Sequence, residues 1–142
     1  MIPAAIPLQA QYILGFQHAL SAAGDNAPSM LDETQVYIGL NDADTKEQLY
    51  ETKAYVSLLK EICRNYKVPF SFDVIEGGYM HDDGEYTEEK SIVLTFIDVP
   101  QDTVDAIAKE LCRLFHQESV LMTSERLLVR SVRVDSGNTD CH

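Results

Sequence analysis

Residues 70–97 read FSFDVIEGGYMHDDGEYTEEKSIVLTFI, and this stretch decides the fold. Apolar side chains alternate with polar ones over 70–74, as in a strand that buries one face. A second alternating run follows over 92–97. Between the two runs lies Asp83-Gly84, a dipeptide typical of tight hairpin turns. The stretch therefore predicts an antiparallel β-hairpin.

Two irregularities are expected within the strands. The pair Gly77-Gly78 suggests a bulge or a bend in the first strand of the hairpin, because glycine weakens regular strand pairing. A last strand region runs over 119–134, near the end of the chain. Within it, the polar residues 124–126 are expected to form a turn or a bulge.

Amphipathic helices flank the hairpin on both sides. The first is expected to begin at Asp44, with Glu47 three residues later in a capping-box pattern, and to run to about Tyr66 before Pro69 stops it. The second is expected to open at Pro100. Their apolar stripes comprise Leu49, Val56, Leu59, Cys63 and Tyr66 in the first helix, and Val104, Ile107, Leu111, Leu114 and Phe115 in the second.

An alternating strand over 35–41 precedes the first helix, so the order from residue 35 is β-α-β-β-α-β. This order predicts an α+β, ferredoxin-like sandwich with two helices on one face of a four-stranded antiparallel sheet. The expected strand order in such a sheet is 4-1-3-2. A sheet of this kind leaves its other face free of helices.

The domain organisation follows from the same patterns. Residues 33–134 are expected to form the ferredoxin-like domain. Residues 1–32 are expected to hold an N-terminal amphipathic helix, over 8–23, and a linker. Residues 135–142 are predicted to be a disordered tail.

The end of the second helix carries a distinctive phrase, FHQESVL at residues 115–121. It resembles the Phe-x-Gln-Glu-Ser-Val-Leu phrase of a small bacterial family, domain-of-unknown-function family 3574. The resemblance covers roughly residues 35–123. It implies the same ferredoxin-like layout and assigns no activity and no catalytic residue. Further matching stretches are YIGL at 37–40, GY at 78–79, DG at 83–84 and EKS at 89–91.

Charge limits the classes of partner. The 142 residues carry a formal net charge of −12, and the sequence pI is about 4.5. So negative a chain repels phosphate backbones, which argues against direct binding to DNA or RNA. Two interpretations of the charge stay open: solubility in a crowded cytoplasm, or a protein partner with a basic face. No apolar run reaches the length of a membrane span, so no membrane partner is expected.

The cysteines indicate a reducing compartment. Cys63, Cys112 and Cys141 are odd in number, and their spacing matches no metal motif. They are interpreted as reduced thiols. The apolar N-terminus lacks the positive start of a signal peptide, so a cytoplasmic location is predicted.

Titratable residues are expected to meet at one end of the sheet. In the 4-1-3-2 order, the end of the first strand, the hairpin turn and the end of the second helix lie together. Carboxylates and two imidazoles there would suit Zn or Mn, or acid–base chemistry. Caps, turns and a cation at a helix end would explain the same residues structurally. The set comprises Asn41, Asp42, Asp44, His81, Asp82, Asp83, Glu85, His116 and Glu118, with His81, Asp83, His116 and Glu118 as the candidates for a divalent metal.

Two function classes remain. The sequence contains no Gly-x-Ser-x-Gly elbow, Walker loop, His-Glu-x-x-His or Gly-x-Gly-x-x-Gly motif. No catalytic residue or organic cofactor is therefore assigned. The preferred hypothesis is a non-enzymatic, dimeric protein-interaction or regulatory module, such as an anti-defence protein of a mobile element. The alternative is a small metal- or ligand-binding enzyme that uses the polar end of the sheet.

Self-association is predicted from the free face of the sheet. Tyr37, Val93, Thr95 and Ile97 are expected to point away from the helices, and they are more apolar than a solvent-exposed face requires. Either a second subunit or the helix over 8–23 must cover them. A two-fold homodimer is the expected assembly.

Overall fold

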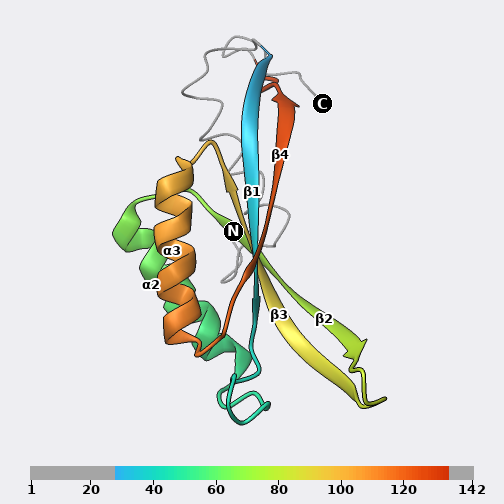
Figure 1. Ribbon diagram of the computed structural model, residues 1–142. Helices are drawn as coiled ribbons and strands as arrows, with labels where there is room; N and C mark the ends of the chain where they lie inside the picture. The colour runs from blue at the N-terminus through green and yellow to red at the C-terminus, as the bar shows by residue number, and fades with distance from the viewer. Residues whose placement is uncertain (1–27, 135–142) are drawn as a thin grey trace.

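The computed structural model describes residues 28–134 as a four-stranded sheet with two helices against one face (Figure 1). The helix predicted over 8–23 and the tail predicted over 135–142 lie outside the described residues. The elements in chain order are β1 (Ser29–Gly39), α2 (Thr52–Tyr66), β2 (Ser71–Met80), β3 (Tyr86–Ile97), α3 (Gln101–Leu114) and β4 (Leu121–Val129).

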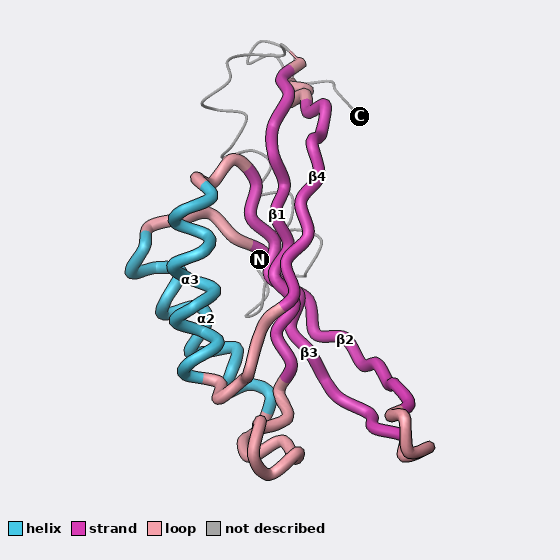
Figure 2. Tube along the Cα trace, viewed as in Figure 1, coloured by secondary structure: helices cyan, strands magenta, loops and turns pink. Residues whose placement is uncertain are grey.

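The sheet order confirms the ferredoxin-like α+β prediction. Neighbouring strands run antiparallel in the order β2-β3-β1-β4, which is the expected 4-1-3-2 order read from the other edge. β1 already begins at Ser29, within the segment expected to be a linker. The sheet is long and twisted: β1 and β4 project past the helices at one end, and the β2–β3 hairpin projects at the other (Figure 2).

The β2–β3 hairpin is regular where a bulge was expected. Gly77 pairs with Glu89 and Gly78 with Glu88 in unbroken register, so of the two alternatives predicted there, a bulge or a bend, the bulge is excluded. The absence of a side chain at Gly78 instead makes room for a neighbour. An added Cβ would lie 2.7 Å from the hydroxyl of Tyr86, whose ring covers the glycine.

Two further features were predicted in the strand regions: a turn at Asp83-Gly84 and an interruption over 124–126. The turn is present. The hairpin turns at Asp83-Gly84, where Gly84 has φ 87° and donates its N–H to the carbonyl of His81 at 2.9 Å. Only glycine adopts such a φ without strain. The interruption expected over 124–126 is wrong, because these residues pair with 32–34 of β1 in continuous register.

The first helix starts later than its sequence pattern predicts. α2 begins at Thr52, not after Asp44, and the residues between form turns. The physical reason is local: the carboxylate of Asp42 binds the backbone N–H groups that follow it, and Lys46 has a left-handed φ of 63°. Hydrogen bonds like those of Asp42 also occur at helix starts, so it is the left-handed φ of Lys46 that prevents a helix from continuing at that point. Leu49, expected in the apolar stripe, is consequently 50% exposed.

The core lies between the sheet and the paired helices. Tyr66 and Leu114, which end the two predicted stripes, are 39% and 41% exposed, so these two assignments are wrong. Neither α2 nor α3 has the length and apolarity that a membrane crossing requires. The largest fully buried side chains are Phe96, Ile38, Leu40, Leu59, Ile92, Leu94, Ile107, Leu111, Val36, Val104 and Cys63.

The helix-free face carries the side chains expected there. Tyr37 lies opposite Val93, and Thr95 and Ile97 follow at intervals of two on the same face of β3. Val93, Thr95 and Ile97 are nonetheless buried. Ile97 belongs to a second, smaller apolar cluster to which β1 and β4 also contribute.

The two cysteines among the described residues are free thiols, as predicted. Cys63 is buried in the core, and burial raises the pKa of its thiol to about 12. Cys112 is half-buried on α3. Cys141 lies outside the described residues. A thiol with so high a pKa is protonated at neutral pH, so Cys63 serves packing.

Candidate functional site

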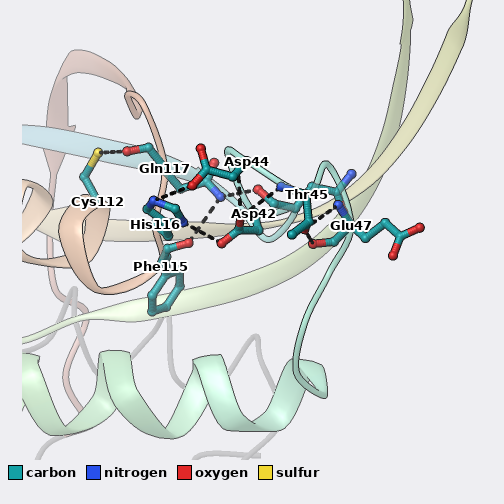
Figure 3. A network of polar contacts seen from close by, with 9 residues as sticks. Asp42, Asp44, Thr45, Glu47, Cys112, Phe115, His116 and Gln117 are labelled. Carbon is teal, nitrogen blue, oxygen red and sulfur yellow. Dashed lines mark hydrogen bonds and ion pairs between the residues drawn. The ribbon is translucent and has the colours of Figure 1, made fainter.

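Asp42 organises the loop that follows β1. Its side chain is only 7% exposed. One carboxylate oxygen, Oδ2, accepts the backbone N–H groups of Asp44 at 2.9 Å and Thr45 at 3.1 Å. The other, Oδ1, lies 2.7 Å from Nδ1 of His116, at the end of α3 (Figure 3). Every oxygen of this buried carboxylate therefore has a hydrogen-bond partner, as burial requires.

The turn between α3 and β4 is tied to the same loop. Ala43 donates its N–H to the carbonyl of His116 at 2.9 Å. The side-chain amide of Gln117 donates to the carbonyl of Asn41 at 2.6 Å. The thiol of Cys112 donates in turn to the Gln117 carbonyl at 3.2 Å (Figure 3). Two segments far apart in the sequence thus form one continuous wall.

The hairpin joins this wall through Glu89. Its Oε2 accepts the backbone N–H of Asn41 at 2.9 Å, and the side chain of Asn41 donates to the Glu88 carbonyl at 3.4 Å. The Glu89 carboxylate lies across Gly39, where an added Cβ would come 2.5 Å from it. A side chain at position 39 would therefore displace the Glu89 carboxylate from this place. The loop, the α3–β4 turn and the hairpin all converge on Asn41.

Two hollows open beside this junction, and Asn41 and Glu89 line both. The larger, of about 400 Å³, extends along the hairpin. The smaller, of about 310 Å³, reaches the loop and the α3–β4 turn. Both volumes fall within the usual range of small-ligand pockets. Besides the shared pair, the charged and aromatic lining residues are Glu76, Glu88, Lys90 and Tyr86 in the first hollow, and Asp42, Lys46, Glu118, Tyr79 and His81 in the second.

The side chains that line each of the two hollows carry a net negative charge. Each hollow has three carboxylates and one lysine. In the larger one, Lys90 lies 4.0 Å from the carboxylate of Glu76, so its charge is partly matched. The resulting field favours a cationic or hydrogen-bond-donating ligand over an anionic one.

Within this junction, the pKa values of Asp42 and His116 depart from their ordinary range. The backbone N–H of Thr45, and then the His116 ring, lower the pKa of the Asp42 carboxyl. The hydrogen bond to Asp42, and then the charges of Asp42 and Asp44, raise the pKa of His116. The two directions agree with a charged pair of imidazolium and carboxylate.

The structure brings only part of the predicted polar set together. Asp42, Asp44 and His116 meet, with Nε2 of His116 3.5 Å from Asp44. His81 and Glu118 line the smaller hollow beside Asp42. The turn holding Asp82, Asp83 and Glu85 forms the tip of the hairpin, where Asp83 Oδ1 accepts the backbone N–H of Glu85 at 2.9 Å.

The metal prediction stays a prediction, and its four residues do not form one cluster. Of His81, Asp83, His116 and Glu118, only His116 belongs to the group within residues 28–134 whose potential ligand atoms lie within 4.8 Å of one another. Asp42 and Asp44 complete that group. Because both oxygens of Asp42 already accept hydrogen bonds, internal hydrogen bonding accounts for the cluster without a cation.

Sequence reasoning missed Glu89 and Gln117 as site residues. Both occur in stretches that carried the family resemblance, EKS and FHQESVL, but neither was assigned a role. A glycine at 39, directly before the polar loop, is the signal for a close approach in this region. Only the strand register identifies Glu89 as the residue that makes it.

Comparison with solved structures reveals a shared fold. A phage SAM lyase in complex with S-methyl-5′-thioadenosine matches with a TM-score of 0.53 and 22% sequence identity, over 76% of this chain and 92% of that one. A phage SAM lyase in the apo state matches with a TM-score of 0.52 and 22% identity, over 73% and 92%. No protein-family model and no curated protein sequence matches this chain. The resemblance to family 3574 therefore stays a prediction.

Proposed function

We propose that this chain binds S-adenosylmethionine, or a thioadenosine derived from it, in the acidic hollows around Asn41 and Glu89. The observation that carries the proposal is the Glu89 carboxylate. The Asn41 N–H fixes it in place, and Glu89 is a lining residue of both hollows at the point where three chain segments meet. This is the ligand-binding alternative raised by the sequence, now centred on different residues.

The chemistry of the lining suits such a ligand. S-adenosylmethionine carries a sulfonium cation, which a fixed carboxylate stabilises in a partly desolvated hollow. Tyr86 in the larger hollow and Tyr79 in the smaller offer ring faces that attract cations and stack on adenine. The excess of carboxylates over lysines disfavours phosphorylated nucleotides, which are also adenine ligands.

The structural likeness supports the proposal without establishing it. The two phage proteins share the fold, and one of them holds S-methyl-5′-thioadenosine. A mobile-element setting, in which this chain serves as an anti-defence protein, is compatible with their phage origin and forms part of the proposal. A fold alone does not determine a function.

Calorimetric titration tests the proposal directly. S-Methyl-5′-thioadenosine is expected to bind the wild-type chain saturably, whereas adenosine diphosphate, which carries negative charge, is expected to bind more weakly. Incubation with S-adenosylmethionine followed by chromatography shows whether the chain also cleaves its ligand, because breaking the bond between the sulfonium sulfur and the γ-carbon of the methionine chain releases S-methyl-5′-thioadenosine and a four-carbon amino acid fragment. If neither S-methyl-5′-thioadenosine nor S-adenosylmethionine binds saturably in the calorimeter, the proposal is contradicted.

A second candidate function is a dimeric protein-interaction module, and the exposed apolar surface favours it. Met80 and Tyr86 on the hairpin are 67% and 60% exposed, and Leu121 and Leu128 on β4 are 64% and 71% exposed. Large apolar side chains exposed at strand edges and tips are typical of contact surfaces. The first partner would be a second copy of the chain. The resulting dimer would bind a protein with a basic face, which complements the net charge of −12.

Light scattering tests the assembly. The dimer proposal expects a mass about twice the chain mass of 15.9 kDa, independent of dilution over the micromolar range. Leu121→Glu should shift the protein toward monomer, because Leu121 lies opposite Tyr37 on the helix-free face. Leu58→Glu, at a half-buried position on α2, is the control: it introduces the same charge away from β4, so it shows whether the change in mass comes from loss of the fold. A wild-type protein that stays monomeric at every concentration excludes the dimer.

A further inference from the structure

β2 forms one edge of the sheet, and its outer side is open. In the order β2-β3-β1-β4, no strand within residues 28–134 lies beyond it. Every residue from Asp73 to Met80 is exposed. Figure 2 shows β2 projecting together with β3 past the ends of the helices. An exposed edge strand presents a row of backbone donors and acceptors to which another strand can bind.

The strand register shows which backbone groups of β2 point outward. Lys90 lies opposite Glu76, and the carbonyl of Lys90 accepts the N–H of Leu40, directly after β1, at 3.0 Å. Lys90 therefore turns its backbone groups toward β1, and Glu76 turns its own away from β3. The pattern alternates along an antiparallel pair, so every second residue of β2 points outward. The outward N–H groups are those of Phe72, Val74, Glu76, Gly78 and Met80.

β2 lacks several features that protect edge strands against pairing. Protected edge strands are commonly short, bulged, or interrupted by proline or lysine. β2 has ten residues, contains neither proline nor lysine, and pairs with β3 without a bulge. Val74 on one face and Ile75 and Tyr79 on the other are 37%, 38% and 52% exposed. The edge therefore offers apolar contacts on both faces besides its backbone groups.

Charge decides what kind of strand fits this edge. Residues 71–97 contain seven carboxylates and one lysine, which gives a formal charge of −6. Lys90 lies 4.0 Å from Glu76, whereas Asp73 belongs to no ion pair among the described residues. A second copy of β2 would bring its own carboxylates to the same interface, where like charges repel. A strand with basic side chains is attracted instead.

We propose that the outer edge of β2 binds an extended segment of another protein as an additional strand, and that this segment has the pattern basic–apolar–apolar–basic. The basic side chains lie opposite Asp73 and Glu76, and the apolar ones lie opposite Val74 and Ile75. In this mode of recognition, backbone hydrogen bonds supply affinity and alternate side chains supply specificity. The existence of a basic partner rests on the second candidate function. The binding of S-adenosylmethionine is not required.

Amide hydrogen exchange with a synthetic probe tests the pairing. The probe is a threonine-rich peptide of about ten residues with Lys-Val-Val-Lys at its centre. At about ten times its dissociation constant, it should slow the exchange of the Val74, Glu76 and Gly78 amides about tenfold. The Asp98 N–H, which donates to the Asp32 carbonyl at the far end of the sheet, is the reference and should not change. A probe that does not bind, or that leaves the three outward amides unchanged, overturns the proposal.

A second peptide separates backbone pairing from attraction by charge alone. It has the same side chains, but the backbone nitrogens of its Lys-Val-Val-Lys centre are methylated, so it keeps both charges and loses those donors. Its affinity for the wild type, measured by calorimetry, should be lower by about tenfold or more, because several hydrogen bonds are lost together. Equal affinity of the two peptides overturns strand addition, while the basic partner of the second candidate function survives.

Two matched proline variants locate the edge that is used. Val74→Pro removes an outward N–H and leaves the bonds between β2 and β3 intact, so the probe should bind about tenfold more weakly to a folded protein. Leu128→Pro makes the same change on β4, the opposite edge, and should leave the affinity unchanged. Leu128 points outward because Asp32 turns its carbonyl to Asp98, which makes Arg126 and every second residue from it outward positions.

Equal weakening by the two prolines, or none by Val74→Pro, contradicts the use of β2. If Val74→Pro does not fold, the two peptides decide the matter on the wild type. Glu76→Gln measures the contribution of charge, and should weaken binding of the probe about two- to fivefold, the range of an exposed ion pair. An unchanged affinity of this variant contradicts the placement of a basic side chain opposite Glu76.

The free protein distinguishes a second copy from another protein as the occupant. If β2 paired with β2 of a second copy, the Val74, Glu76 and Gly78 amides would become protected as the protein concentration rises without any probe. The proposal expects their exchange to be independent of concentration over the micromolar range. Protection that increases with concentration at these amides would assign the edge to self-association and overturn the proposed partner.

Discussion

Glu89→Gln is expected to weaken the binding of S-adenosylmethionine by about 10- to 100-fold, the usual effect of losing an interaction with a buried or partly buried charge. Glutamine has the same shape and still accepts the Asn41 N–H, so the local structure should survive. In the proposed complex, this variant lacks the negative charge next to the sulfonium. S-Methyl-5′-thioadenosine has a neutral thioether, so its affinity should fall much less. Calorimetry measures the loss of affinity for each compound. The ratio of the two losses gives the part that is due to the charge of Glu89.

Two further variants make this prediction specific. Gly39→Ala keeps the charge but places a Cβ where the Glu89 carboxylate lies, so it should also weaken binding. Glu61→Gln removes an exposed carboxylate from α2, away from both hollows, and should leave both affinities unchanged. If Glu89→Gln binds S-adenosylmethionine as the wild type does, the carboxylate has no part in ligand binding.

Phe96→Ala is expected to lower the free energy of unfolding by about 3–5 kcal/mol, because it leaves a large cavity in a well-packed core. Phe96 is 1% exposed and lies on β3, where it packs in the cluster between the sheet and both helices. Leu128→Ala, at an apolar position 71% exposed on β4, should change the same quantity by no more than about 0.5 kcal/mol. Urea denaturation with an unchanged slope measures both.

A milder variant covers the case in which Phe96→Ala does not fold. Ile107→Val removes one methylene group from a fully buried position on α3 and should cost about 0.5–1.5 kcal/mol. Similar costs for a core substitution and for Leu128→Ala would mean that the helices do not cover this face of the sheet. The hollows would then lack the support that fixes their walls.

The layout of the chain follows from local patterns that need no tertiary information. Alternation over β2 and β3, the turn at Gly84 and the start of α3 after Pro100 are properties of short segments, and the structure has all of them. The strand order then follows from the few topologies open to such a sequence of elements. This is why the ferredoxin-like prediction was confirmed although no family model matches the chain.

The details that failed depend on competition between neighbouring residues. Asp44 fits a capping pattern, but Asp42 accepts the Asp44 and Thr45 N–H groups instead, and the left-handed φ of Lys46 ends the turn that they begin, so that α2 starts only at Thr52. The Gly77-Gly78 pair fits a bulge, yet its lack of side chains leaves space for the Tyr86 ring. The capping pattern at Asp44 and the Gly77-Gly78 pair are each compatible with two local structures, and contacts with other parts of the chain decide which one forms.

The polar cluster was predicted at the end of the sheet where the two hollows lie, but without Glu89 and Gln117. Topology placed Asn41, Asp42 and His116 together, and the structure confirms that. It could not place Glu89, because its contact with Asn41 depends on the register between β1 and β3. A shift of one residue would turn Glu89 to the opposite face.

Nuclear magnetic resonance titration with S-methyl-5′-thioadenosine tests the central claim most directly, because it reports both binding and location. The account predicts saturable shifts of the Asn41, Glu89 and Gln117 amides, which surround the two hollows, and no shift of the Asp98 amide at the far end of the sheet. Shifts confined to that far end, or no saturable shift at all, would contradict it.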